Sequence, residues 1–294
     1  MGSVGRFAPS PTGDLHLGSL IAALGSWLDA KSSPNGQWLL RIEDLDTARV
    51  RADSEGSILA TLAAFGFEWP KPPWRQSHRL ERYEQAVATL QRRIPLFRCQ
   101  CSRRQLAAEG EACCVGECRT LHCEPRDSSL RADLSVLEAA TVRDRSLGEV
   151  RFDPAVHRDV VVRRRDGVFA YQLAVVVDDA EQGVTDVVRG ADLLDSTPWQ
   201  LGLLQALGQP PPRYLHLPLV VEADGQKLAK SRRSVRIDSH NAAQTLRDAL
   251  KLLKQPSPPS QICDPRELLS TAAAQWQPEN FRGEREVRLP PADT

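Results

Sequence analysis

The chain lacks an excess of charge of either sign. Its 294 residues include 38 lysine and arginine residues and 38 aspartate and glutamate residues, so the formal net charge is zero. A protein with this balance has no global positive field to attract nucleic acid. Any nucleic-acid partner must therefore be bound by local basic patches.

Long apolar runs and internal repeats are also missing. No apolar stretch approaches the roughly 18 residues of a membrane-spanning helix, so we expect no transmembrane segment. Because a motif already begins at Arg6, we expect no signal peptide. Hydrophobic residues make up 41% of the chain and charged residues 26%, which excludes disordered and fibrous classes. We expect a cytoplasmic protein with two or three structural units.

The most informative segment lies near the N-terminus. Residues 7–19 read FAPSPTGDLHLGS and are followed by an apolar run over residues 20–28. This pattern predicts a strand, a tight loop and the start of a helix. A helix N-terminus offers unpaired backbone N–H groups and a positive dipole end, which suit a phosphate. Gly18 lets a nucleotide approach the backbone, because glycine has no Cβ.

This segment resembles the HIGH signature of class I aminoacyl-tRNA synthetases, in the form PSPTGxLHxG of the glutamyl enzymes. The signature positions here are His16, Leu17, Gly18 and Ser19. The resemblance implies that His16, Gly18 and Ser19 bind ATP, with His16 and Gly18 taking part in catalysis. A proline-rich loop that caps an ordinary helix is the alternative, which a four-letter match alone would leave open.

A second segment, residues 227–231, reads KLAKS and resembles the KMSKS loop of the same class. Two lysines and a hydroxyl on a loop can close over a triphosphate and neutralise the charge that develops as pyrophosphate leaves. The resemblance implies that Lys227 and Lys230 are catalytic and that Lys230 contacts ATP. Leu228 and Ala229 replace the central methionine and serine.

The resemblance to the glutamyl branch also implies a glutamate pocket. Arg6 matches the arginine that binds a substrate carboxylate, a task that suits the bidentate guanidinium group. Residues 41–46 read RIEDLD and resemble the family's RIEDTD, in which the first glutamate holds the substrate ammonium. The expected glutamate-binding residues are Arg6, Ala8, Ser10, Glu43, Tyr171 and Arg189.

Some of these positions allow structural roles instead. An internal ion pair is an alternative for Arg41 and Asp44, and core packing at a strand end is an alternative for Tyr171.

Adenylate formation needs no general acid or base, because the attacking carboxylate is already ionised at neutral pH. We expect catalysis by positioning and charge stabilisation, with Mg²⁺ on the phosphates of ATP.

Six of the seven cysteines lie between residues 99 and 123. In a cytosolic protein such clustering favours a metal over disulfides. Two short pairs provide four thiolates for one structural zinc ion, and the expected ligands are Cys99, Cys101, Cys114 and Cys118. Cys114 matches a position that is a tyrosine in some relatives, but Cys113 competes with it. Cys123 is left over, and the alternative is a set of unligated buried thiols.

The element pattern predicts an α/β fold with a Rossmann-type parallel sheet. We expect a catalytic domain in two halves, residues 1–94 and 166–240, around a zinc-binding insertion at 95–165. A short helical segment with a frayed polar tail follows at 241–294, without an anticodon-binding domain. Helices are predicted at 54–67, 79–93, 193–207, 242–253 and 267–276, and strands at 38–42, 168–177 and 215–221.

The resemblance covers residues 4–240, and full glutamyl enzymes continue into an anticodon-binding domain that is not expected here. A shortened paralogue of this family activates glutamate without tRNA and transfers it to the queuosine base at the wobble position of tRNA(Asp). We therefore expect a monomer that uses ATP, L-glutamate and this tRNA. Candidate phosphate contacts, or simply solvated charges, are Arg163–Arg165, Arg103, Arg104, Arg232 and Arg233.

Two other functions remain open. One is a compact glutamyl-tRNA synthetase that charges an ordinary acceptor end. The other is a non-catalytic, zinc-stapled RNA-binding protein, although such a module would have no need for a complete activation pocket.

Overall fold

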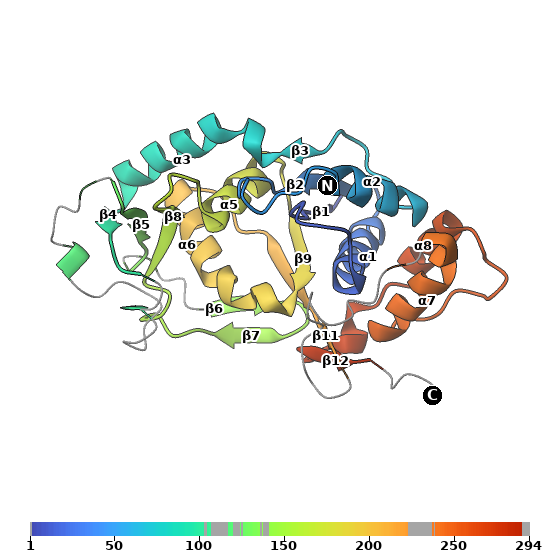
Figure 1. The fold of residues 1–294 in the computed structure, drawn as a ribbon. Helices are drawn as coiled ribbons and strands as arrows, with labels where there is room; N and C mark the ends of the chain where they lie inside the picture. The colour runs from blue at the N-terminus through green and yellow to red at the C-terminus, as the bar shows by residue number, and fades with distance from the viewer. Residues whose placement is uncertain are drawn as a thin grey trace.

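A parallel sheet organises the fold. The computed structural model describes residues 2–102, 105–106, 117–119, 124, 126–135, 137, 141–222, 237 and 239–289. Strands β1 (Val4–Phe7), β2 (Gln37–Ile42) and β3 (Trp74–Arg75) pair in parallel in that order. Strands β9 (Asp186–Gly190) and β10 (Arg213–Leu217) are also parallel. The predicted α/β class is thereby confirmed (Figure 1).

The two sets of strands meet between β1 and β9. The backbone N–H of Thr185, just before β9, donates to the carbonyl of Val4 in β1 over 2.9 Å. Beyond β10 lies β6 (Thr141–Asp144), which forms an antiparallel hairpin with β7 (Gly148–Arg151). This order brings the carboxyl ends of β1, β2, β9 and β10 to one edge, where parallel sheets bind their ligands.

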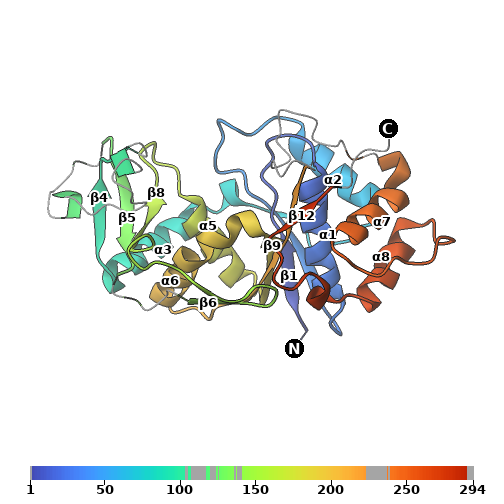
Figure 2. The ribbon, with the colours of Figure 1, turned by 90° about the horizontal axis from the view of Figure 1, so that it is seen from below.

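Helices divide into two packed groups, each with its own hydrophobic core (Figure 2). Helix α1 (Leu17–Lys31) packs against β1, β2 and β9 and also contacts α7 (Ala242–Leu252) and α8 (Pro265–Ala274). The second group consists of α3 (Leu80–Arg93), α5 (Tyr171–Glu181) and α6 (Thr197–Leu207), while α2 (Ser54–Ala64) adds Ile58 and Leu62 to the first core. No helix in the described ranges is long and apolar enough to span a membrane.

A small antiparallel sheet lies at the end of the molecule opposite α7 and α8 (Figure 1). Its strands are β4 (Leu96–Cys99), β5 (Ser129–Asp133) and β8 (Asp159–Arg163). The cysteine-rich segment connects β4 to β5. Short 3₁₀ turns complete the elements: η1 (Gln76–His78), η2 (Glu117–Arg119), η3 (Ala191–Ser196), η4 (Ser239–Asn241) and η5 (Pro278–Phe281).

The chain beyond α8 folds back and forms a separate two-stranded sheet with residues 219–221. Strand β12 (Glu286–Arg288) pairs in parallel with β11 (Leu219–Val221), so this part of the predicted frayed tail is ordered. The indole N–H of Trp276 donates to the buried carboxylate of Asp29 over 3.0 Å, and Arg145 pairs with the same carboxylate at 2.7 Å. Partly buried Val287 packs against the first core, which explains the pairing.

One predicted strand is wrong. Residues 168–177 were expected to form a buried strand, but α5 begins at Tyr171 within them. A valine-rich apolar run has no polar face that separates a period of two from one of 3.6, so a helix buried in the core gives the same signal. Tyr171 is consequently the first residue of a helix and does not lie at a strand end. The strand predicted at 215–221 divides at Pro218 into β10 and β11.

Candidate functional site

A cavity of about 770 Å³ lies where the carboxyl ends of the parallel strands meet the N-terminus of α1. Its wall brings together residues predicted from three distant parts of the sequence. The described predicted residues that line it are Arg6, Ala8, Ser10, His16, Gly18, Ser19, Glu43, Tyr171 and Arg189. The predicted Lys227 and Lys230 lie outside the described residues.

His16 forms the N-cap of α1. Its Nδ1 accepts a hydrogen bond from the backbone N–H of Ser19 over 3.3 Å, and the Ser19 hydroxyl lies 3.1 Å from Nε2. A Cβ on Gly18 would lie 3.2 Å from Cε1 of the same imidazole, which is a tight contact. Glycine therefore allows the imidazole to fold over the helix start, where the backbone N–H groups favour an anion.

Arg6 and Arg41 share one buried carboxylate. Nε of Arg6 lies 3.2 Å and Nη1 of Arg41 lies 2.7 Å from Oδ1 of Asp179. Burial alone would raise the pKa of Asp179, but the two guanidinium groups outweigh it and the pKa is lowered. Asp179 is therefore an anion that neutralises part of the positive charge at this wall.

Glu43 follows β2 and lies beside Arg41, whose Nη2 is 3.3 Å from Oε1. Burial raises the pKa of Glu43 to about 6, although the neighbouring Arg41 and Arg6 oppose this shift. Arg41 is fully buried and forms internal ion pairs with Glu43 and Asp179. This arrangement matches the structural alternative to substrate contact for this arginine. Asp44 is not one of its partners, because that carboxylate accepts hydrogen bonds from the backbone N–H and hydroxyl of Ser77 at 2.8 and 2.6 Å.

Helix α5 carries both a wall residue and a charge cluster. Tyr171 at its first position is in the cavity wall, and burial raises the pKa of its phenol. Two turns later Asp178 is fully buried and binds Arg79 at 2.7 Å, Gln76 at 2.8 Å and the Tyr83 hydroxyl at 2.9 Å. This network links α5 to η1 and α3 and so supports the wall that holds Tyr171.

Arg189, at the end of β9, is held by a set of neutral side chains. Its Nε, Nη1 and Nη2 atoms donate to His216 at 3.2 Å, to Gln200 at 2.7 Å and to Thr197 at 2.8 Å, respectively. None of these three partners was predicted from the sequence. A histidine within the apolar strand β10 was the available signal, since a buried imidazole needs hydrogen-bond partners.

Arg51 is another cavity residue that the motifs did not predict. It is exposed, lines the cavity near Gly13, and its backbone N–H donates to the carbonyl of Pro11 over 3.0 Å. Nothing in the sequence pattern distinguishes Arg51 from other surface arginines.

Three of the four predicted metal ligands come together in the described residues. The Sγ atoms of Cys99, Cys101 and Cys118 lie within 4.8 Å of one another, and those of Cys101 and Cys118 are 3.7 Å apart. Such a set of thiolates fits a soft or borderline cation such as Zn²⁺. The candidates for a fourth ligand lie outside the described residues: they are Cys113, Cys114 and Cys123.

Of the predicted basic clusters, only 163–165 is described. Arg163 pairs with Glu84, and Arg164 pairs with Asp46 and Asp166 at 2.9 and 2.6 Å.

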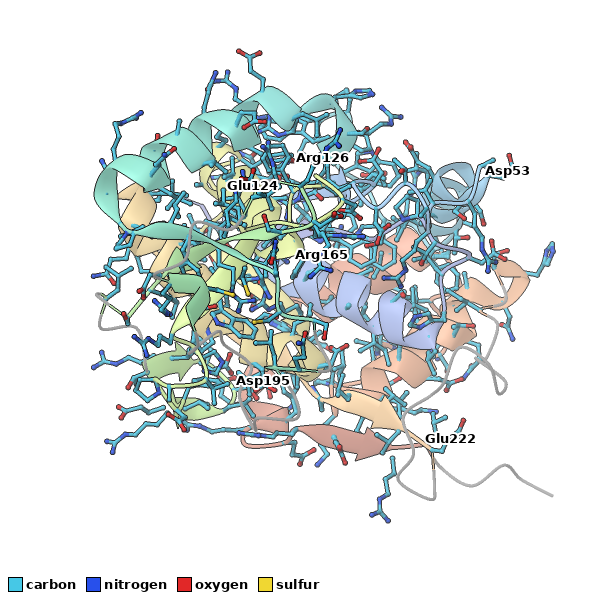
Figure 3. The ribbon with its side chains drawn as sticks, turned by 60° about the vertical axis from the view of Figure 1, so that its left-hand side comes forward. Asp53, Glu124, Arg126, Arg165, Asp195 and Glu222 are labelled. Atoms are coloured by element: carbon cyan, nitrogen blue, oxygen red, sulfur yellow. The ribbon has the colours of Figure 1, made fainter. Side chains whose placement is uncertain are left out.

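Arg165 has a different kind of partner. Its Nη2 donates to the carbonyl of Gln100, between two of the clustered cysteines, over 2.7 Å. Figure 3 shows Arg165 on the same side of the molecule as Arg126 and Glu124. The remaining predicted arginines, at 103–104 and 232–233, lie outside the described residues.

Known proteins resemble this chain in sequence over nearly its whole length. The family model for the catalytic domain of class I tRNA synthetases (E and Q) matches residues 4–253. Glutamyl-Q tRNA(Asp) synthetase of Ectopseudomonas mendocina (strain ymp) is 49% identical over 278 residues, 93% of this chain and 92% of that protein. The protein of the same name from Pseudomonas entomophila (strain L48) is 46% identical over 295 residues, 99% of this chain and 97% of its own length.

Solved structures show the same fold at lower identity. Glutamate-tRNA synthetase from Elizabethkingia anophelis superposes with a TM-score of 0.82 at 22% identity, covering 99% of this chain and 68% of that one. A glutamate tRNA ligase from Elizabethkingia meningosepticum, in complex with its amino acid, gives 0.78 at 23% identity, covering 98% and 67%. At these identities the likeness concerns the fold alone.

Proposed function

This chain belongs to the class I tRNA synthetases of the glutamyl and glutaminyl type, and on that premise we propose that it is a glutamate-activating ligase. It forms glutamyl-adenylate from ATP and L-glutamate without tRNA, then transfers the glutamyl group to the queuosine base at the wobble position of tRNA(Asp). The observation that carries the proposal is one cavity that joins the His16 helix start to two arginines and Glu43.

The charges of the cavity suit a zwitterion with an extra carboxylate. Arg6 and Arg189 supply cationic donors for carboxylates, and Glu43 supplies an anion for an ammonium group. An amino acid with an acidic side chain satisfies all three, whereas an apolar amino acid would leave a buried guanidinium group without its anion. Glutamate is therefore the proposed substrate.

Activation proceeds by attack of a substrate carboxylate oxygen on the α-phosphorus of ATP. A bond from that oxygen to phosphorus forms, the bond to the bridging oxygen breaks, and pyrophosphate leaves with its charge. The His16 helix start positions the nucleotide, and Lys227 and Lys230 are proposed to neutralise the leaving group. Mg²⁺ bound to the phosphates supplies further charge stabilisation.

The acceptor is proposed from the names of the relatives that share 46–49% identity with this chain. We propose that the enzyme acts in the cytoplasm, where ATP, glutamate and tRNA are its substrates. The test offers radiolabelled glutamate and ATP to tRNA(Asp) with and without queuosine. Label on the queuosine-containing tRNA alone supports the proposal, while label on the acceptor end of unmodified tRNA(Glu) would favour a compact glutamyl-tRNA synthetase.

The activation step has a separate test. We expect glutamate-dependent exchange of pyrophosphate into ATP in the absence of tRNA. A silent exchange assay with folded, metal-loaded protein would overturn the enzyme proposal and favour a non-catalytic RNA-binding protein.

Arg165 is the proposed phosphate contact within the basic cluster 163–165, because its two neighbours are already paired with carboxylates. Replacing Arg165 with alanine should weaken tRNA binding and reduce the slope of log affinity against log salt by about one. Pyrophosphate exchange should not change. Arg151→Ala, an exposed arginine paired with Glu149, is the matched control; an equal loss in both variants would contradict a specific contact.

We propose that Cys99, Cys101 and Cys118 hold a structural zinc ion, with a fourth ligand outside the described residues. The ion would staple the segment between β4 and β5, which has few apolar residues of its own. Its proposed role is stability and not chemistry.

The cysteine site gives a direct prediction. Cys101→Ser should reduce bound zinc from about one ion per chain to near zero and lower the melting temperature, because a thiolate ligand is lost. Metal analysis and thermal melts measure both effects, and residual folded protein should keep pyrophosphate exchange. Cys263→Ser, at the exposed seventh cysteine, is the control and should change neither. Loss of exchange with zinc and fold intact would contradict the structural role.

The pKa of Glu43 predicts how glutamate binding depends on pH. Because burial raises this pKa to about 6, the carboxylate is ionised at pH 7.5 and becomes protonated below pH 6. The neutral form cannot attract the substrate ammonium, so KM for glutamate should rise by up to about tenfold per pH unit below pH 6. Exchange kinetics from pH 5 to 8 measure it.

Glu43→Gln is the control for this titration. The variant should have a raised KM for glutamate at every pH and should lose the dependence near pH 6. The same pH dependence in Glu43→Gln and in the unaltered protein would assign the titration to another group.

A further inference from the structure

Among the described residues, the positive charge of Arg189 has no anion beside it. Arg189 is only 4% exposed. Its three side-chain nitrogens donate to the imidazole of His216, the amide of Gln200 and the hydroxyl of Thr197. Within the described ranges no carboxylate lies within 4.0 Å of this guanidinium group. A buried cation without a counter-ion is costly, which makes it a strong attractor for an anionic ligand.

Arg6 differs in this respect, although it lines the same cavity. It is equally buried, but its Nε lies 3.2 Å from the carboxylate of Asp179. That carboxylate also binds Arg41 at 2.7 Å, so the two arginines share one counter-ion. Of the two buried arginines in the cavity wall, Arg189 is therefore the less neutralised.

The geometry around His216 determines which of its nitrogens carries the proton. Nε of Arg189 only donates, so Nε2 of His216, 3.2 Å away, must accept. The proton of the neutral imidazole is then on Nδ1, which donates to Oδ2 of Asp144 over 2.7 Å. Both side chains are fully buried, and they lie on the neighbouring strands β10 and β6.

Asp144 is itself firmly held. Its carboxylate accepts hydrogen bonds from the backbone N–H groups of Ser146, Leu147 and His216 at 2.9, 2.8 and 3.0 Å. This fixed anion keeps the imidazole in one tautomer and one orientation. Burial and the nearby Arg189 also lower the pKa of His216 despite Asp144, in keeping with a neutral ring.

We infer that His216 is a positioning residue, which Asp144 holds in the Nδ1–H form so that Nε2 orients Arg189 as the main carboxylate-binding group for the amino-acid substrate. Three of the five N–H donors of a guanidinium group are used by its neutral partners, and two remain for a bidentate contact. A carboxylate in place of His216 would orient Arg189 equally well but would neutralise it. This inference rests on the proposed activation of glutamate and adds how the pocket maintains its affinity.

Two substitutions separate positioning from packing. In His216→Asn the amide nitrogen takes the place of Nδ1 and can still donate to Asp144, but no atom remains to accept from Arg189. In His216→Gln the longer amide reaches the place of Nε2 and can accept from Arg189, while the bond to Asp144 is lost. The exposed variant His78→Asn serves as the control, since His78 lies outside the cavity wall.

We expect His216→Asn to raise KM for glutamate by about tenfold in pyrophosphate exchange, with KM for ATP close to that of the unaltered protein. His216→Gln should leave KM for glutamate nearly normal. The melting temperature should fall in both variants, because each leaves a buried polar group without its partner. His78→Asn should change none of these values. Equal rises in both KM values for His216→Asn, or a lower melting temperature alone, would overturn the inference.

Calorimetric titration with glutamate distinguishes this failure from failure of the proposed function. If the unaltered protein binds glutamate but shows no pyrophosphate exchange, the proposed activity is overturned. The affinity of His216→Asn for glutamate, compared with that of the unaltered protein, then decides the positioning role. Absence of glutamate binding by the folded, unaltered protein would overturn both.

Discussion

Replacing Arg189 with alanine should lower kcat/KM for glutamate in pyrophosphate exchange by about 10³-fold. Removing one partner of a buried, hydrogen-bonded charge pair costs roughly 2–5 kcal/mol, and about 4 kcal/mol corresponds to three orders of magnitude. The loss should be large because the other buried arginine of the cavity, Arg6, already shares the carboxylate of Asp179 with Arg41. Exchange measured over a range of glutamate concentrations gives the effect.

Arg6→Ala is the informative comparison for this prediction. Its removal leaves Asp179 paired with Arg41 at 2.7 Å, so we expect a loss at least tenfold smaller than for Arg189→Ala. Arg189→Lys keeps the positive charge but loses the planar guanidinium group. Its loss of kcat/KM should be intermediate between those of Arg6→Ala and Arg189→Ala. KM for ATP and the melting temperature check that each variant is folded. A larger loss for Arg6→Ala would show that Arg6 is the main carboxylate anchor.

Replacing Asp178 with alanine should lower the free energy of unfolding by about 3–5 kcal/mol, because it leaves buried cationic partners without their anion. The carboxylate is fully buried and binds Arg79, Gln76 and Tyr83 at 2.7–2.9 Å, with Arg41 at 3.7 Å. Denaturant unfolding followed by circular dichroism measures the change.

Asp248→Ala is the matched control for Asp178→Ala. Its carboxylate is half exposed and pairs with Lys251 at 3.3 Å on the surface of α7, where such pairs contribute about 0.5 kcal/mol or less. Asp178→Asn keeps some of the hydrogen bonds and should give an intermediate loss. Similar stability for Asp178→Ala and Asp248→Ala would contradict the structural importance of the buried network.

Parts of this protein depend on contiguous sequence and were predictable from it. The strand, loop and helix that place His16 and Gly18 follow from prolines, glycines and an apolar run within about two dozen residues. The clustering of cysteines near residue 99 likewise predicted that thiols would gather, and three of them do. In both cases the chain between the residues is short, so local geometry limits where the side chains can go.

Other parts could not be predicted, because a fully buried segment has no polar face from which a helical or strand period can be read. The valine-rich run around Val175 predicted a strand, yet it forms α5. Tyr171 and Asp178 lie two turns apart on this helix, the first in the cavity wall and the second in the charge network. Only packing against α3 and α6 distinguishes the two conformations, since both bury the same side chains.

From the sequence alone it was possible to predict the family, the helix start that is proposed to bind the nucleotide, and the arginines and glutamate that are proposed for the pocket. The tertiary structure alone decided how their charges are compensated: Asp179 lies against Arg6, while His216 from β10 meets Arg189 from β9. The physical reason is that electrostatic compensation depends on distances of about 3 Å between residues far apart in the chain. Motif spacing carries no information about such contacts, so the difference in charge compensation between the two arginines appears only in the folded protein.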